Sequence, residues 1–75
     1  MTRAEAVAAV LPGEWVTSRA VAERAGSTVD AAVHPLSDGV AAGLLVRRHA
    51  YKARREYWEY ALPETAQAEQ RRGVL

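Results

Sequence analysis

Residues 18–26 read SRAVAERAG, a short helical segment that ends in a glycine. Three small or β-branched apolar residues recur at helical spacing and predict its buried face: Val21, Ala22 and Ala25. Thr17 or Ser18 can cap the start of this helix, and Gly26 stands where a left-handed C-terminal cap is needed. The stretch therefore predicts a helix over about residues 18–25 with a sharp turn after it.

A longer helix is predicted directly after this turn, over about residues 28–42. Ser27 and Thr28 offer an N-cap, and Gly43 ends the helix. Its apolar residues follow the spacing i, i+4, i+7, i+11 and predict one inward stripe, made of Val29, Val33, Leu36 and Val40.

Two features leave the geometry of the 28–42 helix open. Ala32 competes with Val33 for the inward position, so the register is uncertain by one residue. Pro35 lacks a backbone N–H and crowds the preceding turn. We expect either a kink at His34-Pro35 or two short helices, the second beginning with Pro35 in its first turn.

The residues before this pair of helices predict a further helix and a short strand. Thr2 and Glu5 have the spacing of a capping box, and Pro12-Gly13 ends the helix, which spans about residues 3–11. Residues 14–16, Glu-Trp-Val, fit a short strand because they include an aromatic and a β-branched residue.

The residues after Gly43 predict two strands joined by a basic turn. The strands cover about residues 44–50 and 56–62, and the turn covers residues 51–55. Pro63 ends the second strand. Residues 64–75 are polar and charged, and they predict either a frayed helix over 64–72 or a disordered tail.

The aromatic residues divide into two predicted groups. Trp15, Trp58 and Tyr60 are expected to seal the sheet onto the helices, because the chain contains no phenylalanine for that purpose. Tyr51 and Tyr57 are expected on an exposed surface, where they could stack on a nucleobase or form a protein-binding patch.

Length and composition exclude several classes of protein. A chain of 75 residues forms one small domain and lacks the room for a deep cleft between domains. The absence of cysteine excludes disulfides and thiolate chemistry, and two histidines, His34 and His49, are too few for a histidine metal cluster. We expect no catalysis, cofactor, metal or small-molecule ligand. No apolar run has the length of a membrane span, so a cytoplasmic location is expected.

Positive charge is concentrated in one short segment. Residues 47–55 carry five of the ten basic residues and no acid, whereas the other 66 residues sum to a net charge of −4. Such an asymmetry is typical of a surface that binds phosphate groups.

Element order and three segments resemble the winged helix-turn-helix domains of bacterial and phage transcriptional regulators. The segments are SRAVAERAG (18–26), AAGLLVRR (41–48) and RREYWEYALP (54–63). The resemblance covers about residues 2–63 and gives one domain over residues 1–63. It implies a mainly α fold of order α-β-α-α-β-β with a small antiparallel β-hairpin, the wing.

The resemblance also implies binding to double-stranded DNA and a part in transcription regulation or an accessory DNA-binding role. The 28–42 helix would then lie at the major groove, and the residues facing the bases would be Thr28, Asp30, Ala31, His34 and Ser37. Phosphate contacts would come from Arg19, Arg47, Arg48, Lys52, Arg54 and Arg55. Many relatives form homodimers.

The 28–42 helix departs from the usual pattern of a base-reading helix. Residues 27–43 contain no lysine or arginine but contain Asp30 and Asp38. An alternative interpretation is therefore a protein–protein interaction module, a winged-helix adaptor or a phage protein that binds a host factor, which presents this acidic helix to a protein partner.

Overall fold

The computed structural model describes residues 1–73 and arranges them as four helices and a three-stranded sheet. The elements in chain order are α1 (Arg3–Ala8), β1 (Val16–Thr17), α2 (Ser18–Arg24), α3 (Val29–Ala41), β2 (Val46–Lys52), β3 (Arg55–Ala61) and α4 (Pro63–Arg72). The first six elements confirm the predicted order and the predicted fold class. Of the two alternatives for residues 64–75, α4 confirms the helix, and residues 74–75 lie outside the described part of the chain.

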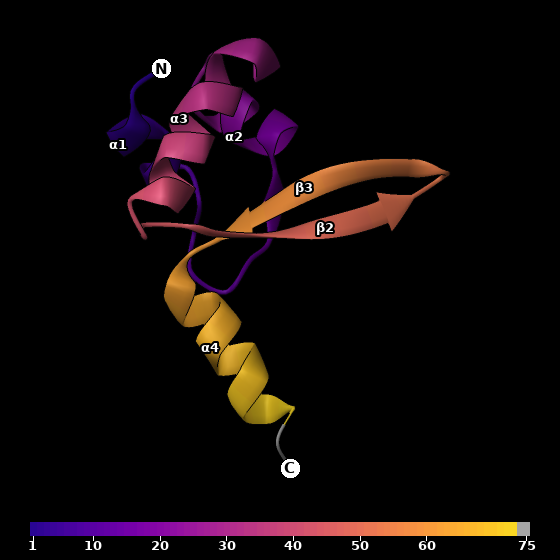
Figure 1. Cartoon of the computed structure of the whole chain (residues 1–75). Helices are drawn as coiled ribbons and strands as arrows, with labels where there is room; N and C mark the ends of the chain where they lie inside the picture. Colours follow the sequence, from indigo (N-terminus) through magenta and orange to yellow (C-terminus); the bar gives the residue numbers. More distant parts are fainter. Residues whose placement is uncertain (74–75) are drawn as a thin grey trace.

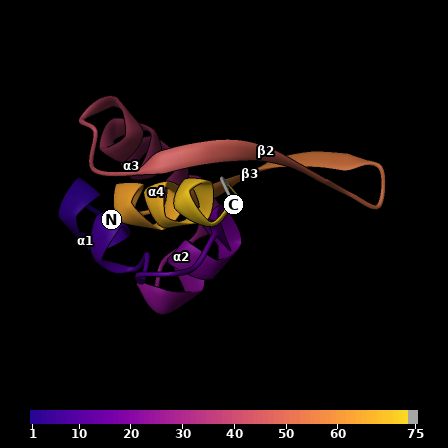
Figure 2. The ribbon, with the colours of Figure 1, turned by 90° about the horizontal axis from the view of Figure 1, so that it is seen from below.

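The sheet is antiparallel, with the strand order β1-β3-β2. β1 contributes only two pairs, Val16 opposite Tyr60 and Thr17 opposite Glu59. β2 and β3 pair along their whole length, from Val46 opposite Ala61 to Lys52 opposite Arg55. The β2–β3 hairpin extends well beyond the group formed by α1, α2 and α3, and α4 leaves the domain in a different direction (Figures 1 and 2).

Side-chain caps fix the starts of the first three helices. The hydroxyl oxygens of Thr2, Thr17 and Thr28 accept hydrogen bonds from the backbone N–H three residues later. At α1 the box is reciprocal, because the Thr2 N–H donates to Oε1 of Glu5 at 3.1 Å. These hydrogen bonds with Thr2 favour the ionised carboxylate and hold the pKa of Glu5 below its ordinary value of 4.5.

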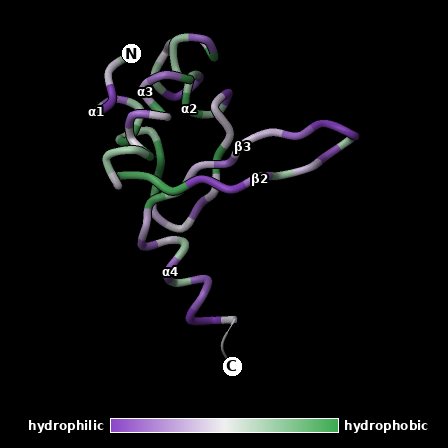
Figure 3. Tube along the Cα trace, viewed as in Figure 1, coloured by the Kyte–Doolittle hydropathy of each residue, from purple (hydrophilic) through white to green (hydrophobic). Residues whose placement is uncertain are grey.

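The core lies between the three N-terminal helices and the base of the sheet. Its buried apolar residues are Ala6, Val10, Val16, Val21, Ala22, Ala32, Leu36, Leu45 and Tyr60. Hydrophobic stretches gather in the helical group, whereas much of the hairpin and the outer part of α4 are hydrophilic (Figure 3). Alanine and valine make up six of these nine residues, and such small side chains let helices pack closely.

The observed register of α3 differs from the predicted apolar stripe. Ala32, Pro35, Leu36 and Gly39 are the buried residues of α3. Val29 and Val33 were predicted to face inward, but they are 38% and 49% exposed. The smaller Ala32 takes the inward position because α1 and α2 both pack closely against α3. The helix continues through Pro35, so the alternative of two short helices is wrong.

Several predicted ends were also wrong by a few residues. α1 ends at Ala8 and not at 11, since the chain turns there and buries Val10. β1 covers Val16–Thr17 and not 14–16. β2 and β3 extend nearly to the tip, and the expected 51–55 turn shrinks to two residues, Ala53 and Arg54.

Of the aromatic residues assigned to the core, Tyr60 is buried and Trp15 is partly buried. Trp58 is 37% exposed, so its predicted place in the core is wrong. It shares a face of the hairpin with Tyr60, but it lies two residues nearer the tip.

Candidate nucleic-acid interface

The wing, which we define as residues 46–61, is a long hairpin with a tight turn at its tip. Ala53 and Arg54 both have positive φ angles, 51° and 64°, as in the two-residue turns that match strand twist. This turn places Lys52 directly opposite Arg55, so two like charges lie side by side on one face. The tip therefore concentrates positive charge, and a bound anion would relieve the repulsion between Lys52 and Arg55.

The basic side chains of the wing lie on two different faces. Residues opposite one another in an antiparallel pair share a face, so Arg47 and His49 lie with Tyr60 and Trp58. The guanidinium of Arg47 lies 4.2 Å from the centre of the Trp58 ring, and the His49 ring lies 3.9 Å from it. The contacts with Arg47 and His49 hold the exposed Trp58 ring in place on the surface of the wing.

Arg48 lies on the opposite face and already has acidic partners. Its Nε lies 3.0 Å from Oε1 of Glu59, and one terminal nitrogen lies 3.6 Å from Oε2 of Glu69 on α4. Its guanidinium also stacks on Trp15, 4.0 Å from the ring centre, and the Trp15 indole N–H donates to Glu69 at 2.8 Å. Arg48 therefore connects the wing to α4, and we do not place it among the proposed phosphate contacts.

The other basic residues of the wing have no such partner. Within residues 1–73, Arg48 is the one basic residue of the wing that forms a salt bridge. The exposed basic residues of the wing that form no salt bridge within residues 1–73 are Arg47, Lys52, Arg54 and Arg55. These four remain available to an external anion.

A groove of about 650 Å³ separates the wing from the helices. It is lined by Thr17, Ser18, Arg19, Val29, Lys52, Tyr57 and Trp58. These residues come from β1, the start of α2, the start of α3 and both strands of the wing. Arg19 and Lys52 thus bring positive charge to the groove from two separate elements, while Val29 and the two aromatic residues supply apolar surface.

The predicted base-reading residues lie on or near the exposed side of α3. Asp30 and His34 are exposed, whereas Ala31 and Ser37 are partly buried. Thr28 caps the helix, and its hydroxyl is engaged with the N–H of Ala31. The His34 side chain is 87% exposed, and its Nε2 lies 3.5 Å from Oδ2 of Asp38.

Sequence reasoning missed three residues of this surface: Val29, Val33 and Trp58. Val29 and Val33 were assigned to the core on hydrophobic spacing, and Trp58 was assigned to it because the chain contains no phenylalanine. The competition between Ala32 and Val33 was the one signal in the sequence that could have placed Val33 outside.

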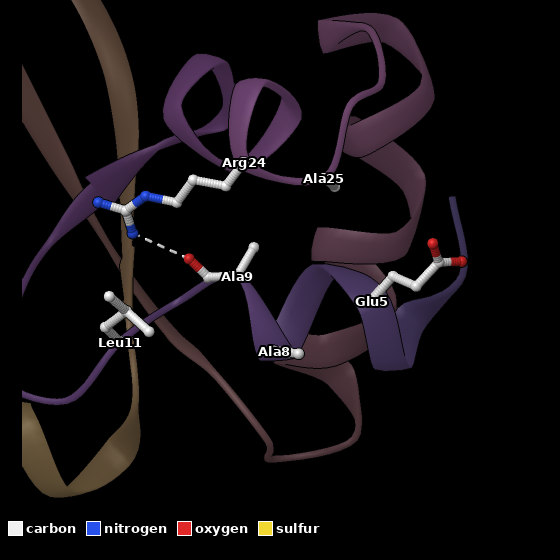
Figure 4. Close-up of a pocket in the computed structure, with 6 residues that line it drawn as sticks. All are labelled: Glu5, Ala8, Ala9, Leu11, Arg24 and Ala25. Atoms are coloured by element: carbon white, nitrogen blue, oxygen red, sulfur yellow. Dashed lines mark hydrogen bonds between the residues drawn. The ribbon is translucent and has the colours of Figure 1, made fainter.

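A second pocket, of about 350 Å³, lies between α1 and the end of α2 (Figure 4). Arg24 contributes to its wall, but its guanidinium donates to the carbonyl of Ala9 at 2.9 Å and pairs with Glu14 at 2.7 Å. Arg24 therefore joins α2 to the segment after α1. Residues 1–73 contain no group of acidic or histidine side chains arranged to hold a metal ion, and no helix among them is long and apolar enough to span a bilayer.

The arrangement of three helices, a short strand and a β-hairpin defines a winged helix-turn-helix-like fold. Among solved structures, the chain is similar to Stf76 from the Sulfolobus islandicus plasmid-virus pSSVx, with a TM-score of 0.57 and 22% sequence identity. The match covers 73% of this chain and 75% of Stf76, and it supports the fold alone. No protein-family model and no curated protein sequence matches the chain.

Proposed function

We propose that this protein is a non-catalytic, double-stranded DNA-binding protein that acts in transcription regulation or as an accessory DNA-binding factor. The observation that carries the proposal is the groove between the wing and the starts of α2 and α3, with Arg19 and Lys52 in its lining. A DNA strand seated there would have the wing on one side and the start of α3, directed to the major groove, on the other.

Charge supports this assignment. The wing carries four exposed basic side chains without an acidic partner, and Lys52 and Arg55 repel each other across the hairpin. Arg19 adds a fifth cation from the start of α2. Phosphate groups spaced along a DNA strand are anions that could neutralise several of these side chains together.

We expect the wing, rather than α3, to make most of the contacts with DNA. Arg47, Lys52, Arg54 and Arg55 lie on the wing, whereas α3 contains no arginine or lysine and presents Asp30 and Asp38 to solvent. Contacts to phosphate carry little sequence information. We therefore expect binding that depends strongly on salt and only moderately on sequence.

Fluorescence anisotropy with a labelled 20-base-pair duplex at several salt concentrations tests the proposal. Three to four phosphate contacts predict a slope of log affinity against log salt of about −3 to −4, and the double variant Arg54→Ala/Arg55→Ala should flatten it by about 2. The matched control is Arg71→Ala/Arg72→Ala, which removes the same charge from the end of α4, away from the wing (Figure 1).

The control separates a local contact from a general charge effect. Equal slopes for the two double variants would mean that the wing has no special part in binding. Absence of binding by the wild-type protein at about 50 mM salt would contradict the proposal, and the protein–protein interaction module would then be the interpretation to pursue.

A further inference from the structure

The exposed side of α3 consists of two parallel rows of residues with different chemistry. Residues four apart in a helix lie one above the other. One row is apolar or small and contains Val29, Val33, Ser37 and Ala41, and the next contains Asp30, His34 and Asp38. Val29 and Val33 are the large apolar side chains of the first row, at 38% and 49% exposed.

The first row continues the groove. Val29 lines the groove together with Lys52 and Trp58, so the row starts beside the basic wing and runs along α3 from there. The acidic row lies one step farther around the helix, and its carboxylates repel phosphate. In a helix that lies in the major groove beside this wing, the apolar row is therefore the one suited to face the base edges.

The composition of α3 limits what it can read. Residues 29–41 contain no arginine, lysine, asparagine or glutamine, the side chains that make the common bidentate contacts to guanine and adenine. An aliphatic side chain at the floor of the major groove has one apolar feature to contact, the 5-methyl group of thymine.

We infer that α3 recognises thymine through its 5-methyl group and that Val33 is the principal specificity-determining residue. The inference rests on the proposed DNA binding and adds to it the base feature that is read. Val33 projects farther into solvent than Val29, and it lies one turn inside the helix, where it can reach the base edges.

The test compares two 20-base-pair duplexes, one of alternating A·T pairs and one with uracil in place of every thymine. The replacement removes the methyl group and leaves every hydrogen-bonding group of the base unchanged. We expect the wild-type protein to bind the uracil duplex about fourfold more weakly for each thymine methyl group that α3 touches. Val33→Ala should lose most of this difference, because it lacks the larger apolar side chain that touches the methyl group.

Arg54→Ala is the matched control. It should weaken binding to both duplexes by the same factor, because a phosphate contact does not depend on the methyl group. A circular dichroism spectrum should show that Val33→Ala is folded, as expected for a residue half exposed to solvent.

Two results would overturn the inference while leaving the proposed function intact. The first is equal affinity of the wild-type protein for the thymine and uracil duplexes. The second is a thymine preference that persists unchanged in Val33→Ala, which would remove the assignment to Val33. Failure to bind either duplex would instead contradict DNA binding itself, so the two failures are distinguishable.

Discussion

Gly39 decides how closely α3 can approach the elements around it. A Cβ atom at this position would lie 2.9 Å from Cδ1 of Leu45 and 3.5 Å from Cγ2 of Val7. Leu45 is fully buried in the segment between α3 and β2, so its side chain has little room to move. The glycine costs helix stability relative to alanine, but it lets α3 contact both α1 and the segment that precedes the wing.

Gly39→Ala should therefore lower the free energy of unfolding by about 1 kcal/mol. Overpacking a core costs about 1–3 kcal/mol, whereas alanine in a helix is favoured over glycine by about 1 kcal/mol. Urea denaturation measures whether the free energy of unfolding falls or rises. In a Leu45→Val background, which removes the closest atom, the same change should become neutral or stabilising. Stabilisation in the wild-type background would show that Leu45 can move aside.

At the scale of elements, Arg48 joins three parts of the fold. It pairs with Glu59 on β3 and Glu69 on α4, and it stacks on Trp15 in the segment before β1. A second connection, the hydrogen bond from the N–H of Gly13 to the buried Thr65 hydroxyl at 3.0 Å, fixes the start of α4. Polar contacts thus connect the base of the wing to α4.

We expect Arg48→Ala to destabilise the domain by about 1–2 kcal/mol, the sum of a partly exposed ion pair and a cation–π contact. Amide hydrogen exchange should accelerate more in α4 than in α3, because the loss of Arg48 leaves the Trp15–Glu69 and Gly13–Thr65 hydrogen bonds to hold α4 to the domain. The salt dependence of DNA binding should change less than in Arg54→Ala. A larger drop in salt dependence with unchanged stability would place Arg48 among the phosphate contacts instead.

Helix starts were predictable from the sequence because their signals are local. Thr2, Thr17 and Thr28 each cap a helix through a hydrogen bond that spans three residues. The inward face of α3 was harder to predict, since Ala32 and Val33 differ in register by a single position. What decides between them is the close approach of α1 and α2, which depends on small side chains far away in the sequence.

Part of the candidate site could also not be predicted from the sequence. The turn at Ala53 and Arg54 adopts positive φ angles without the glycine or asparagine that usually marks such a turn. Without that signal the pairing of β2 with β3 could not be counted from the tip, so the contact between Arg48 and Glu59 was not foreseen. The basic segment 47–55 itself was visible from composition alone.

At the scale of the whole molecule, a small core supports a long charged wing. Leu36, Leu45 and Val21 are the largest fully buried side chains. A domain of this size and core composition is expected to have a free energy of unfolding of only about 4–8 kcal/mol. A ligand that binds the folded state alone will therefore have a large effect on thermal stability.

Duplex DNA should raise the melting temperature substantially at low salt. At a free concentration about 100 times Kd, binding adds about 2.7 kcal/mol to the free energy of unfolding. For a domain of this length, that corresponds to a rise of about 10–20 °C. Differential scanning calorimetry measures the shift, which should shrink in Arg54→Ala/Arg55→Ala and persist in Arg71→Ala/Arg72→Ala. An unchanged melting temperature in saturating duplex would mean that duplex DNA binds the folded domain no more tightly than the unfolded chain. That result would contradict the proposed function.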